Sequence, residues 1–423
     1  MGQGLIISAP SSGSGKTTVT LALLRHLARQ AVPVRGTKSG PDYIDPKFHE
    51  AASGKVCMNL DAWAMTPDRI KALAVGDGLL IVEGAMGLFD GAPPEGKGAV
   101  ADLARMLGLP VVLVVDAGKQ AGSVAPLVAG FAGHDPGVRV AAVILNNVGS
   151  DRHEAMLRRA LEPLGLPILA ALRRDAALAL PSRHLGLVQA GERADLEAFL
   201  DRAAEALAES LDQQALLNLS THLPNARPAK GLTPPAQVIA VAQDEAFAFA
   251  YPHMLADWRA AGAEIKVFSP LADEAVPKAE LVFLPGGYPE LHAGRLATAD
   301  RFLTSLRNAA EHSDIYGECG GYMVLGEGLV DADGQRHTMA GLLPLETSFA
   351  ARKLHLGYRH LTAQSGPFRG RYTAHEFHYA STLKAQGTPL FSATDAEGTA
   401  LPDMGLSQGR VHGSFAHIID AAE

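Results

Sequence analysis

The feature that most constrains the fold is a loop rich in glycine and serine that follows a short apolar run near the N-terminus. The run covers residues 5–7, and the loop covers residues 11–18 with the sequence SSGSGKTT. Glycines let the backbone turn tightly, so successive amides and the positive end of the following helix can face a bound phosphate. The pattern therefore predicts a strand–loop–helix unit that binds a nucleotide.

Within this loop each residue type has an expected role. Gly13 and Gly15 provide the turn, Lys16 places a charge near the outer phosphates, and Thr17, followed by Thr18, can ligate Mg²⁺. Pro10 stands where the usual pattern has its first glycine, so an ordinary glycine-rich turn is the alternative interpretation. Related partition ATPases carry a lysine early in the loop, and here that position is serine, which favours a small-molecule ligase.

Short aliphatic runs alternate with amphipathic segments through the first half of the chain. Strands are expected at residues 5–8, 32–37, 79–83, 111–116, 140–146 and 168–170. Helices are expected at residues 17–29, 99–107, 122–132, 152–161 and 193–211. Strands that are apolar on both faces and alternate with helices predict an α/β fold with a doubly wound, mostly parallel sheet.

A proline-rich stretch, residues 218–235, predicts a linker after a first domain of residues 1–217. Strand signals resume at residues 238–242, 265–268, 281–284 and 315–317, so residues 236–423 are expected to form a second α/β domain.

Composition excludes several other classes of protein. The chain has 423 residues, is 47% hydrophobic and 19% charged, and carries a net charge of −8, which argues against nucleic acid as a partner. Two cysteines cannot form a disulfide framework, and no apolar stretch is long enough for a membrane span or resembles a secretory signal. We therefore expect a cytoplasmic enzyme with no membrane partner.

Acidic side chains follow two of the predicted strands. Asp42 and Asp45 lie on a loop after the second strand, Glu83 ends the third, and Asp90 lies on the loop beyond it. Carboxyl ends of parallel strands line the ligand crevice, so these carboxylates suit metal or substrate positioning. Turn formation and helix capping are the alternative roles. Asn146 ends another strand, where it could contact adenine or simply be a common strand-end residue.

The second half contains the spacing of a nucleophile elbow, with Cys319 in the sequence GECGG at residues 317–321. Gly286 and Gly287 end a neighbouring strand and can supply amides to an oxyanion, and the helix behind Cys319 is expected to lower its thiol pKa. His417 is the expected base. The other histidine candidates are His375, His378 and His412. Cys57 lacks such a setting and is assigned to packing.

At this point the chain resembles a known family. Residues 285–290 (PGGYPE) and 375–379 (HEFHY) are similar to signatures of the cobyrinic or hydrogenobyrinic acid a,c-diamide synthases. Its first half is similar to phosphate-loop ligases of the dethiobiotin synthetase type. Its second half resembles a class I glutamine amidotransferase. The resemblance implies that Cys319 releases ammonia from L-glutamine, and that ATP and Mg²⁺ convert the c and then the a acetate side chain of a corrinoid polycarboxylate to acyl phosphates.

The resemblance also implies residue roles. Thr17 and Glu83 would hold Mg²⁺ with Asp42 or Asp45, Lys38, Tyr43 and Ile44 would contact the corrinoid, and Asp90 would position the reacting carboxylate. The family's glutamate two residues after the catalytic histidine is Ile419 here, so the third member of a triad is open and a Cys319–His417 dyad is expected. A homodimer is also expected, although no sequence feature specifies its interface.

Three alternatives stay open from the residues. One is amidation of another tetrapyrrole, such as nickel-sirohydrochlorin, and one is the later, multi-site cobyric acid synthase reaction. The third belongs to a different class: a nucleotide-dependent switch or partition ATPase with a degenerate amidotransferase domain. Ser11 and the intact elbow around Cys319 oppose that third alternative.

Overall fold

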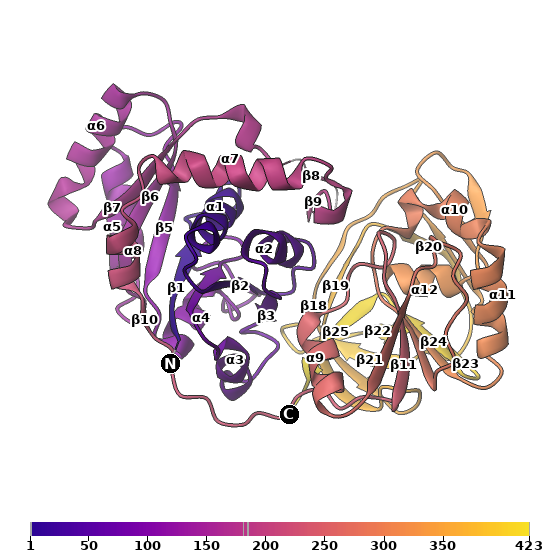
Figure 1. Ribbon diagram of the computed structural model, residues 1–423. Coiled ribbons are helices and arrows are strands. Elements are labelled where there is room, and N and C mark those ends of the chain that lie inside the picture. The colour runs from indigo at the N-terminus through magenta and orange to yellow at the C-terminus, as the bar shows by residue number, and fades with distance from the viewer. Residues whose placement is uncertain (1, 181, 184–185, 423) are drawn as a thin grey trace. The chain divides into compact units, whose positions relative to one another are not determined.

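The computed structural model describes residues 2–180, 182–183 and 186–422. The chain divides into two compact units, Met1–Ala229 and Lys230–Glu423 (Figure 1). Each unit is built around its own sheet, so each is described separately below.

The first unit contains an eight-stranded sheet with the order β3-β2-β4-β1-β5-β6-β7, in which β10 pairs with β1. All pairs along this path are parallel, and only β10 is antiparallel. The strands are β1 (Gln3–Ser8), β2 (Val34–Ser39), β3 (Met58–Leu60), β4 (Leu79–Glu83), β5 (Val111–Asp116), β6 (Val140–Val148), β7 (Ile168–Arg173) and β10 (Thr221–His222). A short antiparallel pair, β8 (Ser182–Arg183) and β9 (Gly186–Leu187), lies apart from this sheet. The expected parallel α/β sheet is confirmed.

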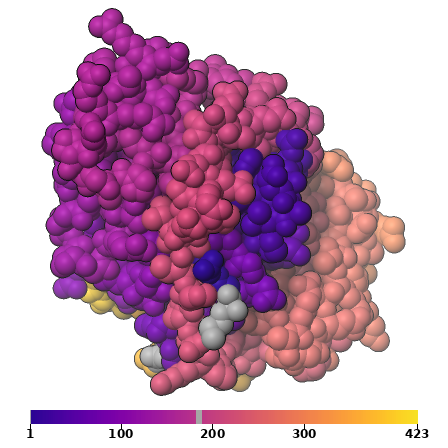
Figure 2. Space-filling view, turned by 60° about the vertical axis from the view of Figure 1, so that its left-hand side comes forward, coloured from indigo at the N-terminus to yellow at the C-terminus, as the bar shows by residue number. Residues whose placement is uncertain are grey.

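Helices connect these strands, as the alternating pattern predicted. They are α1 (Lys16–Arg29), α2 (Asp45–Ser53), α3 (Pro67–Ala74), α4 (Val100–Leu107), α5 (Val124–Gly133), α6 (Asp151–Leu161), α7 (Leu196–Ala208) and α8 (Gln213–Leu219). Helices α1 and α7 lie side by side, joined by ion pairs from Arg25 to Glu197 and Asp201 (Figures 1 and 2). Strand β5 reads VVLVVD and only its terminal Asp116 is exposed, because helices cover both faces of the sheet.

The proline-rich stretch begins inside regular structure. Residues 218–219 end helix α8, and Thr221–His222 form β10 against Gly4 and Gln3. The first unit extends to Ala229, and within it the start of this stretch is paired with β1.

The second unit contains a six-stranded sheet with the order β12-β11-β13-β14-β24-β23. Its strands are β11 (Val238–Ala242), β12 (Glu264–Phe268), β13 (Leu281–Leu284), β14 (Asp314–Glu318), β23 (Leu406–Gln408) and β24 (Val411–Ser414). Only β23 is antiparallel to its neighbour. The helices are α9 (Pro252–Ala260), α10 (Ala293–Ala297), α11 (Asp300–Ala309) and α12 (Gly320–Leu325).

Two smaller sheets complete the second unit, with the orders β16-β15-β17-β20 and β22-β21-β18-β19-β25. Their strands are β15 (Gly328–Val330), β16 (Arg336–Thr338), β17 (Leu345–Ser348), β18 (His355–Ala363), β19 (Gly370–His378), β20 (Ser381–Ala385), β21 (Phe391–Thr394), β22 (Ala400–Met404) and β25 (Ala416–Ala421). The core under the main sheet includes Phe247, Phe302 and Leu306. Among the described residues, no helix combines the length and the apolar character that crossing a membrane requires.

Candidate functional site

The phosphate loop has the backbone conformation that its glycines predicted. Gly13 and Gly15 have φ values of 79° and 89°, in the left-handed region that favours glycine, and Gly15 caps helix α1. The side chain of Lys16 is buried, and its Nζ donates to the carbonyl oxygen of Ser11 at 3.2 Å. This curled loop at a helix N-terminus presents the geometry that binds an anion.

Asn146 lies against this loop. Its Nδ2 donates to the carbonyl oxygen of Ser14 at 3.0 Å, and a Cβ on Gly15 would lie 2.0 Å from that Nδ2. Only glycine therefore fits at position 15 while Asn146 holds the loop. Thr18 faces a different segment, since its Oγ1 donates to the carbonyl oxygen of Leu178 at 3.4 Å.

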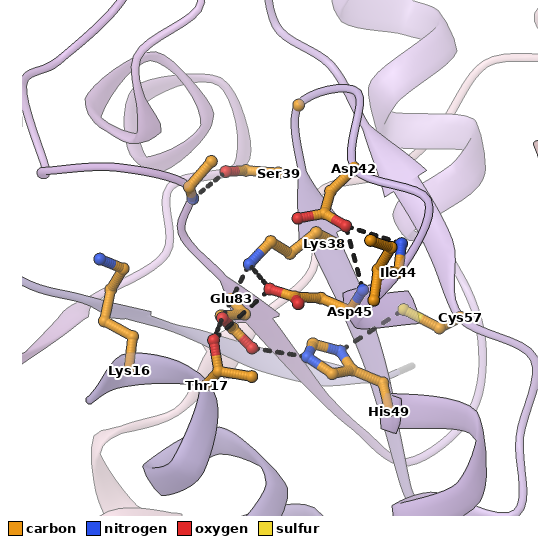
Figure 3. A network of polar contacts seen from close by, with 12 residues as sticks. Lys16, Thr17, Lys38, Ser39, Asp42, Ile44, Asp45, His49, Cys57 and Glu83 are labelled. Atoms are coloured by element: carbon orange, nitrogen blue, oxygen red, sulfur yellow. Dashed lines mark hydrogen bonds and ion pairs between the residues drawn. The ribbon is translucent and has the colours of Figure 1, made fainter. Parts of the chain in front are cut away.

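Two of the four predicted carboxylates, Asp45 and Glu83, meet at the start of helix α1 (Figure 3). Thr17 Oγ1 donates to Glu83 Oε1 at 2.6 Å and lies 3.4 Å from Asp45 Oδ2. Lys38 Nζ bonds to the same two carboxylate oxygens, at 2.7 Å for Glu83. Helices α1 and α2 and strands β2 and β4 thus bring one hydroxyl, two carboxylates and one ammonium group into a single network.

A further member of this network, His49, is absent from the sequence predictions. Its Nε2 lies 2.6 Å from Glu83 Oε2, and its Nδ1 lies 3.4 Å from Cys57 Sγ, with all three side chains buried (Figure 3). His49 comes four residues after Asp45 in helix α2, a spacing that puts both on one helix face. That spacing is the sequence signal that could have identified it, and Cys57 is indeed buried in the packing.

Charges inside the network shift the pKa values of its members. Burial and the neighbouring Asp42 and Glu83 raise the pKa of Asp45 to about 7, against the opposing effect of Lys38. Burial would raise the pKa of Glu83, but Lys38 and His49 outweigh it and hold that pKa well below its usual value. The Glu83 carboxylate is therefore ionised and already balanced by cations.

Lys16 has the opposite shift. Burial and the nearby charge of Lys38 lower its pKa to about 8, although Glu83, Asp45 and Asp90 act to raise it. A phosphate bound beside a buried lysine that already has a cationic neighbour stabilises the ammonium form of that lysine, because the phosphate adds negative charge.

The remaining predicted residues of this half lie around the network. Asp42 Oδ1 accepts from the amides of Ile44 at 2.8 Å and Asp45 at 3.0 Å, so it shapes the turn that leads into helix α2. Ile44 is buried and Tyr43 is partly exposed. Asp90 is exposed and its Oδ2 accepts from the amide of Gly87 at 2.8 Å, so its carboxylate lies apart from the bonded network.

In the second unit, Cys319 occupies the strained turn that its glycine neighbours predicted. It joins β14 to helix α12 with a φ of 46°, a conformation rare for a residue with a side chain. Its amide donates to the carbonyl oxygen of Ser414 at 2.8 Å. A Cβ on Gly321 would lie 1.9 Å from the carbonyl oxygen of Leu284, so the turn requires a residue without a side chain there.

Gly286 and His417 meet at this cysteine. A Cβ on Gly286 would lie 2.4 Å from His417 Cε1, 3.0 Å from His417 Nε2 and 3.2 Å from Cys319 Cβ. Gly287 also borders this turn, because a Cβ on Gly320, the residue after Cys319, would lie 3.0 Å from the amide nitrogen of Gly287. The glycine pair, the cysteine and the histidine are therefore brought together from three elements distant in sequence.

The other histidine candidates have different surroundings. His412 lies in the body of β24, where its Nδ1 is 2.8 Å from Ser407 Oγ. His378 stacks on Phe415 with ring centroids 3.9 Å apart. His375 pairs with His417 across β19 and β25. Burial and the charges of His417 and Arg359 lower the pKa of His375 to about 3, so it stays neutral near pH 7.

The expectation that the helix behind Cys319 lowers its thiol pKa is wrong. Burial raises that pKa strongly, and the carboxylates of Glu290, Glu376 and Glu318 add to the effect. The amide of Gly320 acts in the lowering direction but is outweighed. The resting sulfur is therefore a thiol, and it needs a base to become a nucleophile.

Near this centre, His355, Glu376 and His378 place their polar atoms within 4.8 Å of one another. Arg359 donates to Glu376 Oε2 from Nη2 at 2.7 Å and from Nε at 3.0 Å, and the rings of His355 and His378 stack with an interplanar angle of 5°. A guanidinium on the carboxylate repels a cation, and parallel stacked rings cannot aim their lone pairs at one ion. Within this cluster, the ion pair of Arg359 with Glu376 joins β18 to β19.

The two units match two described domain models. Residues 5–188 match the CobQ/CobB/MinD/ParA nucleotide binding domain. Residues 238–423 match the CobB/CobQ-like glutamine amidotransferase domain. A nucleotide-binding domain joined to a glutamine amidotransferase domain defines the class of glutamine-hydrolysing ligases, and the chain is an enzyme of this class.

Curated relatives identify the branch. Proteins named hydrogenobyrinate a,c-diamide synthase are 57% identical in Rhizobium meliloti, 55% in Brucella anthropi and 52% in Rhodobacter capsulatus. Each alignment covers 99% of this chain and at least 98% of the relative. The chain belongs to the hydrogenobyrinate a,c-diamide synthase family.

Proposed function

We propose that this enzyme amidates the a and c side-chain carboxylates of hydrogenobyrinate, using ATP to activate each carboxylate and glutamine as the source of nitrogen. The observation that carries the proposal is the presence in one chain of two buried centres. One is the phosphate loop beside the network of Lys38, Asp45 and Glu83, and the other is the strained Cys319 beside His417.

In the first centre, the curled loop and Lys16 would bind the ATP phosphates and stabilise the charge that develops during transfer of the γ-phosphoryl group. Transfer to a substrate carboxylate would give an acyl phosphate, whose carbonyl carbon ammonia then attacks, releasing phosphate. Tyr43 and Ile44 adjoin the network on the chain and would contact the corrinoid. Asp90, exposed and close enough to act on Lys16, would position the reacting carboxylate.

The residues of this centre fit a magnesium ion. Thr17 Oγ1, Glu83 and Asp45 offer hard oxygen donors within hydrogen-bond distance of one another, the ligand type that Mg²⁺ prefers. These three would hold the ion, which would neutralise phosphate charge when bound. Lys38 forms ion pairs with both carboxylates. A bound magnesium ion would neutralise these carboxylates in its stead, and the ammonium group of Lys38 would then be available to bind the substrate carboxylate.

In the second centre, His417 would accept the thiol proton, and the Cys319 sulfur would attack the side-chain amide carbon of glutamine. The amides of Gly286 and Gly287, two glycines that border the turn at Cys319, would stabilise the oxyanion. Proton return from His417 would release ammonia, and water would hydrolyse the thioester to glutamate.

The relatives' names do not favour nickel-sirohydrochlorin amidation, the cobyric acid synthase reaction or a nucleotide-dependent switch. A homodimer in the cytoplasm is proposed as the working form, and sedimentation velocity of the purified chain measures its assembly.

A pair of variants tests the division of labour. Cys319→Ala should abolish amidation of hydrogenobyrinate from glutamine and retain amidation from ammonium ion, whereas Lys16→Ala should abolish both. Both assays count the diamide product by mass. If Cys319→Ala kept its full glutamine-dependent turnover, the assignment of Cys319 as the nucleophile of the second centre would be refuted.

A further inference from the structure

A buried carboxylate immediately precedes the nucleophile in the chain. Glu318 is the last residue of β14, is 1% exposed, and stands next to Cys319 at the turn. An ionised carboxylate inside a protein is costly unless charged or hydrogen-bonding groups face it. The groups that face Glu318 therefore indicate what it does.

Both oxygens of Glu318 face strand β25. Oε1 accepts a hydrogen bond from the amide of Ile418 at 3.1 Å, and Oε2 lies 3.6 Å from Nδ1 of His417. The second distance is slightly longer than a direct hydrogen bond. Hydrogen bonds of catalytic groups are often long in the free enzyme and shorten when substrate binds.

The ring of His417 has its other edge toward the nucleophile. Its Cε1 and Nε2 border the same point beside Gly286 that Cβ of Cys319 borders. One ring nitrogen thus faces the acid and the other faces the region of the sulfur. A proton on Nδ1, directed to Glu318, leaves the lone pair of Nε2 to receive the thiol proton.

The other acids near His417 have hydrogen-bond or ion-pair partners of their own. The position two residues after His417 is Ile419, which is fully buried and apolar. Glu376 is bonded to Arg359 and to His378. Asp420 accepts a hydrogen bond from the amide of Ala421 at 2.9 Å, and a bulge in β25 sets it opposite Thr373, two residues along β19 from the partner of His417. Among the residues that the structure describes around this ring, Glu318 has the suitable position.

We propose that Glu318 is the third member of a Cys319–His417–Glu318 triad, a positioning residue that fixes the orientation and tautomer of His417. The inference rests on the proposed role of Cys319 and deepens it. The thiol proton moves to Nε2 as the sulfur–carbon bond forms, and Glu318 stabilises the resulting imidazolium. That proton then passes to the departing nitrogen as the carbon–nitrogen bond breaks. The acid comes from the residue before the nucleophile, in place of the position that Ile419 occupies.

A tyrosine of the same strand, Tyr316, also borders Glu318. Tyr316 lies two residues earlier on the same strand face, and burial together with the Glu318 carboxylate raises its pKa well above the usual value. Its hydroxyl therefore remains protonated near the carboxylate.

The substitution Glu318→Gln separates the positioning role from a merely structural one. Glutamine keeps an oxygen that can accept from the amide of Ile418, but it carries no charge for His417. We expect glutaminase kcat to fall by ~10²–10⁴, the range known for loss of the acid of a catalytic triad. The KM for glutamine should change less than about threefold. Alkylation of Cys319 by iodoacetamide, followed by peptide mass spectrometry, should slow in parallel, while amidation from ammonium ion is unchanged.

The matched control is Glu280→Gln. Glu280 Oε2 accepts from the amide of Gln237 at 2.8 Å, at the start of β13 and β11 and so at the opposite end of the strands from Glu318, and the exchange alters the same kind of backbone bond. This variant should keep glutaminase kcat and the alkylation rate. Circular dichroism and thermal melting establish that both variants are folded. If Glu318→Gln does not fold, Glu318→Asp keeps the charge but withdraws it from Nδ1, and it should lower kcat in the same way.

The outcomes separate the two assignments. Glutaminase activity surviving in Cys319→Ala would refute the proposed nucleophile itself. The triad would be overturned, and the nucleophile kept, if Cys319→Ala loses that activity while folded Glu318→Gln retains full kcat. If only Glu318→Asp folds, full kcat in that variant has the same meaning.

Discussion

Gly286→Ala tests whether the glutaminase centre needs a position that has no room for a side chain. The new Cβ would lie 2.4 Å from Cε1 of His417, whereas carbon atoms normally approach to about 3.5 Å. The ring, or the backbone of residue 286, must therefore move by about 1 Å, and neither can do so freely because His417 and Cys319 are each 1% exposed.

The expected loss follows from that displacement. A misplacement of about 1 Å at a reacting group can lower the rate about 10²-fold, and overpacking a core costs typically ~1–3 kcal/mol. We expect glutaminase kcat to fall by about 10² or more while ammonium-dependent amidation is retained. Steady-state release of glutamate and urea denaturation measure the two effects.

A matched glycine provides the control. Gly294 lies in helix α10, and a Cβ there would meet nothing closer than 3.7 Å, the distance to His337 Cε1. Gly294→Ala should keep full activity and gain up to ~1 kcal/mol, since alanine is favoured over glycine in a helix. Normal glutaminase activity in Gly286→Ala would refute the reasoning, because the catalytic groups would then not meet where the structure places them.

Two further predictions concern pH and the first centre. The folded pKa of His375, lowered to about 3 by burial and by the charges of His417 and Arg359, lies below the ordinary value near 6.5. Stability from this group is thus present above about pH 6.5 and falls by ~2 kcal/mol on going to pH 5. The free energy of unfolding, measured by urea denaturation at both pH values, should change less with pH in His375→Gln than in the unaltered enzyme. An equal change with pH in the two proteins would contradict the prediction. His49→Phe removes the partner of Glu83 Oε2, so unfolding free energy should fall by ~1–3 kcal/mol and KM for Mg²⁺-ATP should rise; unaltered values of both would show that His49 does not hold Glu83.

Local sequence patterns were sufficient to predict much of the fold and part of the site. Strands β4, β5, β11 and β13 have the predicted bounds, because each is a short apolar run between turn signals. The loop glycines and the elbow at Cys319 were predictable because glycine is required where φ is positive or a Cβ would collide. Strand β3 was not predicted, because its three residues are too few to show a hydrophobic periodicity in the sequence.

What the sequence did not reveal depends on tertiary contacts. His49 meets Glu83 across 34 residues, and Glu318 meets the amide of Ile418 across 100 residues. No spacing rule reports a partner at that separation. The direction of the Cys319 pKa shift was missed for the same reason, since burial and carboxylates from distant segments outweigh the single nearby amide.

The central claim is that nitrogen released at Cys319 is the nitrogen that enters the substrate carboxylates. The most direct measurement supplies [amide-¹⁵N]glutamine together with unlabelled ammonium ion at a low concentration, and records the mass of the diamide product. The account predicts ¹⁵N in both new amides with the unaltered enzyme and in neither with Cys319→Ala. Unlabelled diamide from the unaltered enzyme, or labelled diamide from Cys319→Ala, would contradict it.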